Sequence, residues 1–337
     1  MRAWIVREFG PYEQVLRLEE RPEPVVRPGS ALVRVLAAGI NFPDILMIAG
    51  RYQERPERPF IPGFESAAEV VEAPRGSGLA PGARVICQVG HGAFCEALCV
   101  DPPEAFPIPA GMSDAEAAGF FLTYQTAWVA LVHRARLRSG EILLVHGGAG
   151  GVGSAAIQLG KALGAQVVAT AGGAEKADLC RRLGADHAVD YARDDFVAAV
   201  QEITGGRGAD VIFDPVGGDV FDRSLRCIAW EGRILPIGFA GGRIPSVAAN
   251  RVLLKNISVL GMYWGTYWQH APHVIREAYA GMVDLYERGS LRPLIHHLYP
   301  MEELPQALTA VARRECRGKA VLDIAGIESL GQKGIPA

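Results

Sequence analysis

The feature that most constrains this chain is a glycine-rich stretch, residues 141–164, that joins a short apolar run to a helical pattern. Residues 142–145 are all apolar, which is typical of a strand buried on both faces of a sheet. Between this run and the helical pattern lies Gly148-x-Gly150-x-x-Gly153. These glycines permit a tight turn, a close approach of backbone to a phosphate, and close packing of helix on strand. The stretch therefore predicts a nucleotide pyrophosphate site at a helix N-terminus.

A regular alternation of strand and helix patterns follows from this point. The expected strands are residues 142–146, 166–170, 187–190, 210–214, 233–238 and 257–262. Helical patterns lie between them at residues 152–163, 174–183, 194–203 and 218–228. Strands joined by crossover helices predict an α/β domain with a doubly wound parallel sheet.

The first 122 residues instead show short strand-like runs separated by Pro and Gly, which favour a mostly antiparallel barrel or sandwich. A capping box, Ser113 to Glu116, opens a helix that leads toward the glycines. Near the other end, a strand pattern at residues 319–324 needs a sheet to join, and we expect that sheet in the first domain. The predicted domains are residues 1–122, completed by 266–337, and a nucleotide-binding domain at 123–265.

Composition excludes several classes of function. The net charge is −3, so no positive excess points to nucleic acid or anionic lipid. The N-terminal residues lack the apolar core of a signal peptide. The most apolar later run, residues 117–132, is interrupted by polar residues and is expected to be a buried helix, not a membrane span. A small-molecule partner remains, with no nucleic acid and no membrane.

The six cysteines include no CxxC pair. Cys87, His91, Cys95 and Cys99 are four residues apart, but an extended segment cannot wrap four such ligands tetrahedrally around one ion. We therefore expect no metal site, and reduced thiols in a cytoplasmic protein.

The loop after the second parallel strand indicates the cofactor. NAD-specific sheets of this kind place an acid about 20 residues beyond the glycines, to bind the ribose 2′-hydroxyl. Ala171 and its neighbours include no acid at that place, and Lys176 supplies a cation at the next helix start. Glu175 is the one residue nearby that opposes this interpretation. The expected cofactor is NADPH, with Lys176 at the 2′-phosphate.

These motifs resemble a known family. The chain is similar to the zinc-free quinone oxidoreductases, related to zeta-crystallin, within the medium-chain dehydrogenase/reductase superfamily. The resemblance covers essentially the whole chain. It rests on Asn41-Phe-Pro-Asp44, Gly50-Arg-Tyr52, Ile61-Pro-Gly-Phe-Glu65, Pro81-Gly-Ala-Arg-Val85, Thr126-Ala127, Gly147 to Gly153, Asp214-Pro-Val-Gly217 and Gly318-Lys319. It implies a GroES-like mostly-β catalytic domain beside a Rossmann domain.

The same resemblance bears on zinc. Zinc-dependent relatives place Cys near the position of Pro43, and His followed by Glu where this chain has Phe64-Glu65. Both first ligands are therefore missing, and nothing corresponds to the four-cysteine loop of those relatives. A catalytic zinc needs three protein ligands and an open position.

The resemblance also implies a set of cofactor contacts. The glycine turn would contribute Gly148, Gly150, Gly151, Val152 and Gly153, and the 2′-phosphate would meet Gly172, Gly173, Lys176 and Tyr191. Other implied contacts are Asn41, Thr126, Gly217, Ile237, Gly238, Phe239, Ala240, Met262, Tyr263, Trp264, Arg317 and Lys319. The sequence itself supports Gly238 and Tyr191, since Gly238 ends one expected parallel strand and Tyr191 follows another, at the carboxyl edge where ligands bind.

Without zinc, the expected reaction is hydride transfer from NADPH to an electron-poor carbon, followed by protonation. Tyr52 is the candidate proton donor, because its loop resembles that of mitochondrial-type enoyl thioester reductases. Packing of Tyr52 over the cofactor, with water as donor, is an equal alternative. Asn41 and Asp44 complete the candidate catalytic set, although an Asx residue such as Asp44 can also serve only to shape the loop.

The sequence thus predicts an NADPH-dependent reductase of a quinone or an α,β-unsaturated carbonyl. The alternative is an NADPH-binding protein with little turnover. Tyr124, Tyr263, Trp264, Tyr267 and Trp268 are candidates to line a flat apolar pocket. Residues 257–264 are equally a candidate edge strand for a homodimer, as in members of the family.

Overall fold

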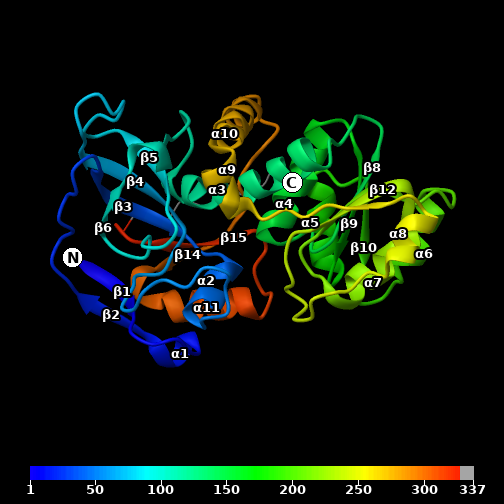
Figure 1. The fold of residues 1–337 in the computed structure, drawn as a ribbon, viewed down its shortest axis with the longest axis horizontal. Coiled ribbons are helices and arrows are strands. Elements are labelled where there is room, and N and C mark those ends of the chain that lie inside the picture. Colours follow the sequence, from blue (N-terminus) through cyan, green and yellow to red (C-terminus); the bar gives the residue numbers. More distant parts are fainter. Residues whose placement is uncertain (327–337) are drawn as a thin grey trace. The chain divides into compact units, whose positions relative to one another are not determined.

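The computed structural model describes residues 1–326 and divides into two compact units. Unit 1 is Met1–Leu122 with the segment from Pro293 on, and unit 2 is Thr123–Arg292 (Figure 1). The second boundary lies later than the sequence suggested. Residues 266–292 belong to unit 2 because they pack on its first helix: Gln125 donates to the carbonyl of Ile275 at 2.9 Å, and Gly281 leaves room for the indole of Trp128.

Unit 1 is built on a mostly antiparallel sheet, as expected. Its strands run in the order β14-β15-β3-β4-β5-β7, and β6 also pairs with β3. Every pair is antiparallel except β14 with β15. A separate antiparallel pair joins β1 (Arg2–Val6) to β2 (Leu16–Glu20). The bounds are β3 (Ala31–Gly39), β4 (Glu65–Glu72), β5 (Arg84–Gln88), β6 (Ala97–Val100), β7 (Ala105–Pro107), β14 (Ile295–Pro300) and β15 (Lys319–Asp323).

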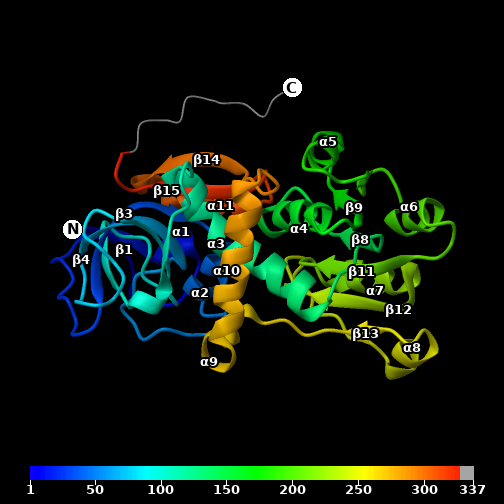
Figure 2. The same cartoon turned by 90° about the horizontal axis from the view of Figure 1, so that it is seen from above.

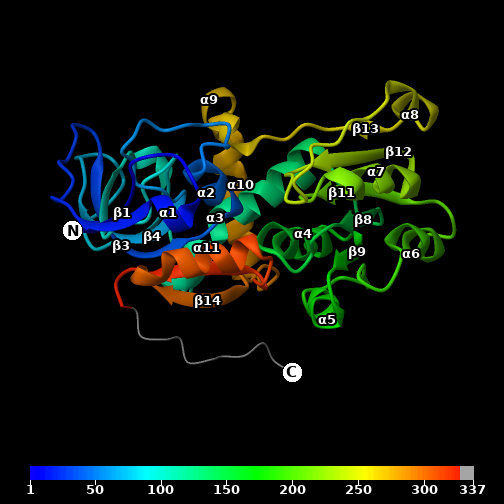
Figure 3. The ribbon, with the colours of Figure 1, turned by 90° about the horizontal axis from the view of Figure 1, so that it is seen from below.

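The expectation that the last strand returns to the first domain is confirmed, because β15 pairs with β3. Unit 1 also contains the short helices α1 (Tyr12–Val15) and α2 (Phe42–Ile48) and the later helix α11 (Leu304–Ala312). Figure 3 shows α11 lying along β14, and α11 also contacts α2. The core of unit 1 lies between these helices and the sheet, with Met47, Ile48, Phe94, Leu304 and Leu308 fully buried.

Unit 2 contains the six-stranded parallel sheet that the sequence predicts. The strand order is β10-β9-β8-β11-β12-β13, and every pair is parallel. This is the order of a dinucleotide-binding sheet. The strands are β8 (Ile142–Val145), β9 (Gln166–Ala171), β10 (His187–Asp190), β11 (Ala209–Asp214), β12 (Ile228–Pro236) and β13 (Ser258–Val259). The last strand is much shorter than expected and forms one edge of the sheet, near α8 (Figure 2).

Helices cover both faces of this sheet. Ile142 and Leu144 of β8 belong to the core cluster of Phe196 and Phe221, on α6 and α7. Leu143, between them, faces α4, where Gly160 lets the helix pack against it. The helices that contact the sheet are α4 (Gly151–Ala162), α5 (Ala174–Arg182), α6 (Phe196–Ile203) and α7 (Gly218–Cys227). The other helices are α3 (Asp114–Trp128), which begins in unit 1, α8 (Ala249–Leu254), α9 (Tyr267–His270) and α10 (Pro272–Glu287).

The helix expected at 117–132 begins earlier and ends differently. The hydroxyl and amide of Ser113 both contact Glu116, which confirms the capping box before α3. After Trp128 the helix continues as a π-helical segment, Val129–Arg134. Among the described residues, no helix is both long and apolar enough to cross a lipid bilayer.

Candidate functional site

The glycine turn lies between β8 and α4, at the carboxyl edge of the unit 2 sheet. Gly153 is required for close packing, because a Cβ there would lie 2.2 Å from the carbonyl oxygen of Gly147. Gly150 is the N-cap of α4, and apart from the same carbonyl at 3.3 Å its Cβ position meets no atom within 4 Å. Both observations agree with the roles that the sequence suggested.

The tight turn itself depends on a different glycine from the one expected. Gly147 has a φ of 62°, a left-handed conformation that favours glycine, whereas Gly148 does not. Gly148 is needed for space, because a Cβ there would lie 2.8 Å from the sulfur of Cys180. Sequence analysis missed the role of Gly147, which could have been read from its place directly after His146 and the strand.

The N-terminus of α4 suits an anion. Gly150 provides no side-chain cap, so the first amides of the helix, at Gly151 and Val152, take no cap bond from it. Such amides and the helix dipole together bind phosphate groups. The turn therefore fits a dinucleotide pyrophosphate, which Gly151 and Val152 would hold through their N–H groups.

The loop after β9 brings three of the expected residues together. A Cβ at Gly172 would lie 2.7 Å from the hydroxyl oxygen of Tyr191, so this ring rests directly on the loop and is half exposed. Gly173 has a φ of 94° and caps α5, whose first turn carries Glu175 and Lys176. The polar surface of this loop fits the ribose phosphate end of a dinucleotide.

Asp190 is a residue of this loop that sequence analysis missed. It ends β10 and is 9% exposed, and its Oδ1 accepts the amides of Gly173 at 2.7 Å and Ala192 at 3.0 Å. An acid therefore lies near the position where the sequence predicts none, but it is committed to backbone. Its position after a strand was the available signal.

The strands β11 and β12 complete the carboxyl edge of unit 2. Asp214, at the end of β11, accepts the amides of Val216 and Gly217 through Oδ1, at 2.9 and 3.0 Å. Burial raises the pKa of this carboxyl, and its Oδ2 has no hydrogen-bond partner among the described residues. Ile237, Gly238, Phe239 and Ala240 follow β12, and Ala240 donates to Pro215 at 3.1 Å.

The remaining expected residues of unit 2 lie on α3 and after β13. Thr126 and Trp264 are each 8% exposed, and Met262 is 9% exposed. The indole of Trp264 donates to Gln125 at 3.4 Å and meets Trp268 edge-on. Of the aromatic residues suggested as a pocket lining, Tyr124 is buried, and its hydroxyl donates to Arg292. This side chain therefore serves the core of unit 2.

In unit 1, Asn41 and Asp44 form the start of α2. The amide of Asn41 donates to Oδ2 of Asp44 at 2.7 Å, and Pro43 occupies the first turn. Asp44 is 0% exposed, and its Oδ1 has no hydrogen-bond partner among the described residues. Burial raises its pKa to about 8. The sequence left open a catalytic role and a loop-shaping role for Asp44, and these contacts favour the loop-shaping role.

The side chain of Asn41 belongs to a buried ionic network. Lys319 donates to Oδ1 of Asn41 at 2.7 Å, to Oε1 of Glu65 at 2.8 Å and to the carbonyl of Ile40 at 2.9 Å. The side-chain nitrogen of Asn41, Nδ2, donates to Oε1 of Glu65 at 3.0 Å and to the carbonyl of Gly39 at 3.3 Å. The second oxygen of Glu65 accepts the amide of Leu122 at 2.8 Å. We call Asn41, Glu65 and Lys319 the buried network.

This network gives Lys319 a structural role beside the cofactor contact that the resemblance implies. Its ammonium has three donors, and all three are directed at protein acceptors in a side chain that is 5% exposed. These contacts allow Lys319 to orient Asn41, and its contact with the cofactor stays a prediction. The sequence shows Glu65 only as part of a motif. Arg317, two residues before Lys319, is exposed at the surface.

Tyr52 follows α2, after Gly50, whose φ is 68°. Its ring meets Phe64 edge-on, with centroids 5.6 Å apart, so Phe64 holds the tyrosine where zinc-dependent relatives have a ligand. Pro43 and Phe64 offer no metal-binding atom. In residues 1–326 there is no group of three or more His, Cys, Asp or Glu residues arranged to hold a metal ion.

Comparison with known proteins gives matches along almost the whole chain. Residues 27–135 match the family model "Alcohol dehydrogenase GroES-like domain", and residues 151–286 match "Zinc-binding dehydrogenase". The chain is 39% identical over 301 residues to quinone oxidoreductase-like protein 2 homolog of Nematostella vectensis, covering 88% of this chain and 82% of that protein. It is 30% identical over 341 residues to the synaptic vesicle membrane protein VAT-1 homolog of Mus musculus, covering 96% and 83%.

A solved structure gives the same result for the fold. The quinone oxidoreductase from Thermus thermophilus, whose complex with NADPH is also known, superimposes with a TM-score of 0.83 at 33% identity. The match covers 96% of this chain and 100% of that one.

Proposed function

Because the chain belongs to the quinone oxidoreductase family of the medium-chain dehydrogenase/reductase superfamily, we propose that it is an NADPH-dependent reductase of quinones or α,β-unsaturated carbonyls that works without zinc. The observation that carries this proposal is the uncapped N-terminus of α4, together with the loop at Gly172–Gly173, where the carboxylate of Asp190 is bonded to backbone amides. The NADPH complex of the Thermus thermophilus relative supports the choice of cofactor.

When bound, NADPH supplies a hydride. The amides of Gly151 and Val152 would hold its pyrophosphate, and Gly172, Gly173, Lys176 and Tyr191 would surround the 2′-phosphate. Because Gly172 has no side chain, the hydroxyl of Tyr191 can lie directly against the loop. The other proposed contacts are the residues after β12 and Thr126, Met262, Tyr263 and Trp264.

The acceptor that gains a hydride becomes an oxyanion or enolate, which needs a proton. We assign this proton to Tyr52, whose ring is held by Phe64. The proposed substitution is Tyr52→Phe, which keeps the ring and removes the hydroxyl. A loss of about a hundredfold in kcat would match a general acid, whereas an unchanged kcat would show that water delivers the proton.

We propose a reaction without zinc because of the residue types at the zinc-ligand positions of the relatives. Pro43 and Phe64 stand where zinc-dependent relatives supply Cys and His, and Glu65 is committed to Lys319 and Leu122. Addition of zinc is therefore expected to leave activity unchanged.

An acceptor screen tests the proposed activity. Purified protein is mixed with NADPH or NADH and a quinone, a conjugated enal or an enoyl thioester, and loss of nicotinamide absorbance is followed. Turnover of at least one acceptor, faster with NADPH, is the expected result. Tight NADPH binding with no turnover of any acceptor would favour the alternative of a binding protein, which similarity to the VAT-1 homolog suggests.

We also propose a homodimer formed through the edge strand β13. Ser258 and Val259 are exposed at the end of the strand order, and Leu253 and Leu254 of α8 are more than 70% exposed. Exposed apolar side chains beside an unpaired edge are typical of strand pairing between copies.

A further inference from the structure

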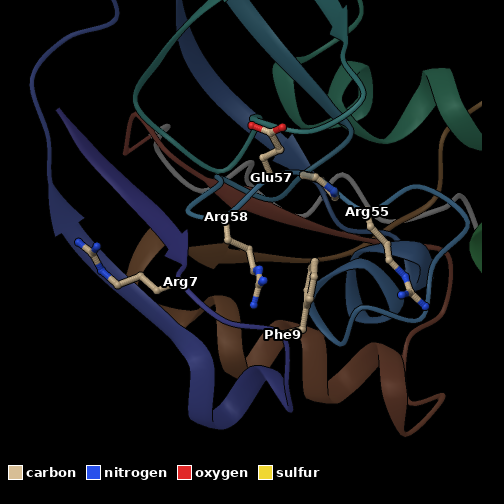
Figure 4. Close-up of a pocket in the computed structure, with 6 residues that line it drawn as sticks. Arg7, Phe9, Arg55, Glu57 and Arg58 are labelled. Carbon is tan, nitrogen blue, oxygen red and sulfur yellow. The ribbon is translucent and has the colours of Figure 1, made fainter.

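A pocket in unit 1 combines guanidinium groups with an aromatic floor. The strand β1 ends at Val6, which exchanges two backbone hydrogen bonds with Phe60, at 2.9 and 3.1 Å. Antiparallel pairing at this point brings Arg7, just after Val6, alongside the end of the loop at residues 51–58. We call the cavity lined by Arg7, Phe9, Arg55, Pro56, Glu57 and Arg58 the arginine pocket; its volume is about 630 Å³ (Figure 4).

The floor of the arginine pocket is fixed by packing. The ring of Phe9 lies against Gly50, where a Cβ would be 2.8 Å from the ring, and its centroid is 6.2 Å from that of Phe60. The guanidinium of Arg58 stacks over Phe9, 4.8 Å from the ring centroid. A stacked guanidinium loses less freedom when it binds a ligand, because its orientation is already restricted.

The charges of the arginine pocket are only partly neutralised. Glu19 accepts two hydrogen bonds from Arg7, at 2.8 and 3.0 Å. Within residues 1–326, neither Arg55 nor Arg58 forms an ion pair. Glu57 also lines the pocket, but Figure 4 shows its carboxylate directed away from the guanidinium of Arg58. Arg55 and Arg58 therefore carry charges that no carboxylate of the described residues neutralises, and Figure 4 shows their guanidinium groups on opposite sides of the Phe9 ring.

We propose that the arginine pocket binds a phosphate group carried on the tail of the acceptor. The inference rests on the proposed reductase function and names its substrate class: phosphorylated acyl thioesters rather than small uncharged electrophiles. Arginine suits phosphate because its fork of donors matches the phosphate oxygens. The same loop begins with Arg51 and Tyr52, so a ligand bound by Arg55 or Arg58 would also hold the loop that carries the proposed proton donor.

Binding is tested apart from turnover. Wild-type protein saturated with NADP⁺, so that the cofactor site is filled, is titrated by calorimetry with butyryl-coenzyme A, a saturated thioester that cannot accept hydride. The double variant Arg55→Gln/Arg58→Gln is expected to bind roughly three- to tenfold more weakly, the range for exposed charge pairs. The control is the double variant Arg34→Gln/Arg75→Gln, which removes the same number of charges from exposed positions on β3 and in the turn after β4.

The control is expected to bind like wild type. Absence of binding by wild type, unchanged binding by the double variant, or an equal loss in the control would overturn the proposal. None of these results depends on turnover, so failure of the proposed reductase activity would be seen separately, as no reduction of any acceptor.

A second experiment identifies the source of the phosphate. The kcat/KM for crotonyl-coenzyme A is compared with that for the uncharged N-acetylcysteamine thioester of the same acyl group, with and without inorganic phosphate at constant ionic strength. A preference for the charged thioester that is lost in the double variant supports the assignment to the acceptor's tail. Activation of the uncharged thioester by inorganic phosphate would contradict it and show a free anion as the ligand.

Discussion

The ammonium of Lys319 lies 2.8 Å from the carboxylate of Glu65, and both side chains are almost completely buried. Removing two charges from water carries a large desolvation penalty, so such a pair is stable only when its other polar atoms are also satisfied. Here Leu122 donates to the second oxygen of Glu65, and Ile40 and Asn41 accept from Lys319. The side-chain amide of Asn41 therefore cannot flip, because its nitrogen donates to Glu65 and its oxygen accepts from Lys319.

Replacing one partner of this pair is expected to destabilise unit 1 strongly. Lys319→Met leaves Glu65 as a lone buried charge, and the expected loss in free energy of unfolding is roughly 3–5 kcal/mol. The double variant Lys319→Met/Glu65→Gln is expected to recover part of the loss, since it removes the remaining charge. Urea unfolding measures both.

The matched control is Lys161→Met, which breaks the exposed pair with Asp186. Its expected effect is below about 1 kcal/mol. If Lys319→Met is no more harmful than Lys161→Met, the buried network does not have the role given to it here.

Asp44 predicts a specific pH dependence of stability. Its pKa is raised from 3.8 to about 8, mainly by burial, so the folded protein keeps a proton that the unfolded chain releases near pH 4. The stability that this proton contributes is complete below the unfolded pKa and is lost as pH rises through the folded pKa. The unfolding free energy of Asp44→Asn should therefore rise relative to that of wild type as the pH increases from 4 to 8, by up to roughly 1.4 kcal/mol per pH unit. A difference in unfolding free energy that does not change with pH would contradict this.

The sequence was sufficient to predict the parallel sheet of unit 2. Each strand there is a short apolar run, and each helix has its own pattern, so local signals define the order of elements. The network in unit 1 was not predictable in this way, because Glu65 and Lys319 are far apart in sequence and no local pattern encodes their contact. A buried glutamate and lysine also contradict the usual preference of both residues for the surface.

The second boundary between the units was misplaced for a similar reason. A helical pattern at 271–288 shows which face is apolar but not which unit covers it, and only the contacts of Gln125 and Trp128 with this helix decide the question. The role of Gly147 was not predicted because the three-glycine motif begins at Gly148, whereas the positive φ belongs to Gly147.

Two glycines of the turn should respond differently to alanine. Gly153→Ala places a Cβ 2.2 Å from the carbonyl of Gly147, so the backbone must shift, and stability should fall by roughly 1–3 kcal/mol. Gly150→Ala meets only one atom, at 3.3 Å, and should fold nearly normally while binding NADPH more weakly. Thermal unfolding and NADPH titration of both variants separate the two effects. Normal NADPH binding by Gly150→Ala would show that the phosphate does not approach this residue.

Lys176 should determine the preference between the two nicotinamide cofactors. Lys176→Ala is expected to raise the KM for NADPH roughly tenfold, the value of one charge-assisted contact, and to leave the KM for NADH unchanged. Lys161→Ala, on the neighbouring helix α4, is the control for loss of a surface lysine. Equal losses with NADPH and NADH would show that Lys176 does not bind the 2′-phosphate.

The proposed dimer is tested at the edge strand. Val259→Arg places a charge on β13 and is expected to convert a dimer to a monomer in light-scattering measurements. Val25→Arg changes an exposed valine of unit 1 in the same way and should leave the dimer intact. A wild-type protein that is already monomeric would exclude this interface.

The central claim is that the carboxyl edge of the unit 2 sheet binds a phosphorylated nicotinamide dinucleotide. Calorimetric titration of the wild-type protein with NADPH, and separately with NADH, tests it most directly. The account predicts one NADPH site per chain, with NADH bound at least about tenfold more weakly because it lacks the phosphate that Lys176 meets. Absence of NADPH binding, or equal affinity for NADH, would contradict it.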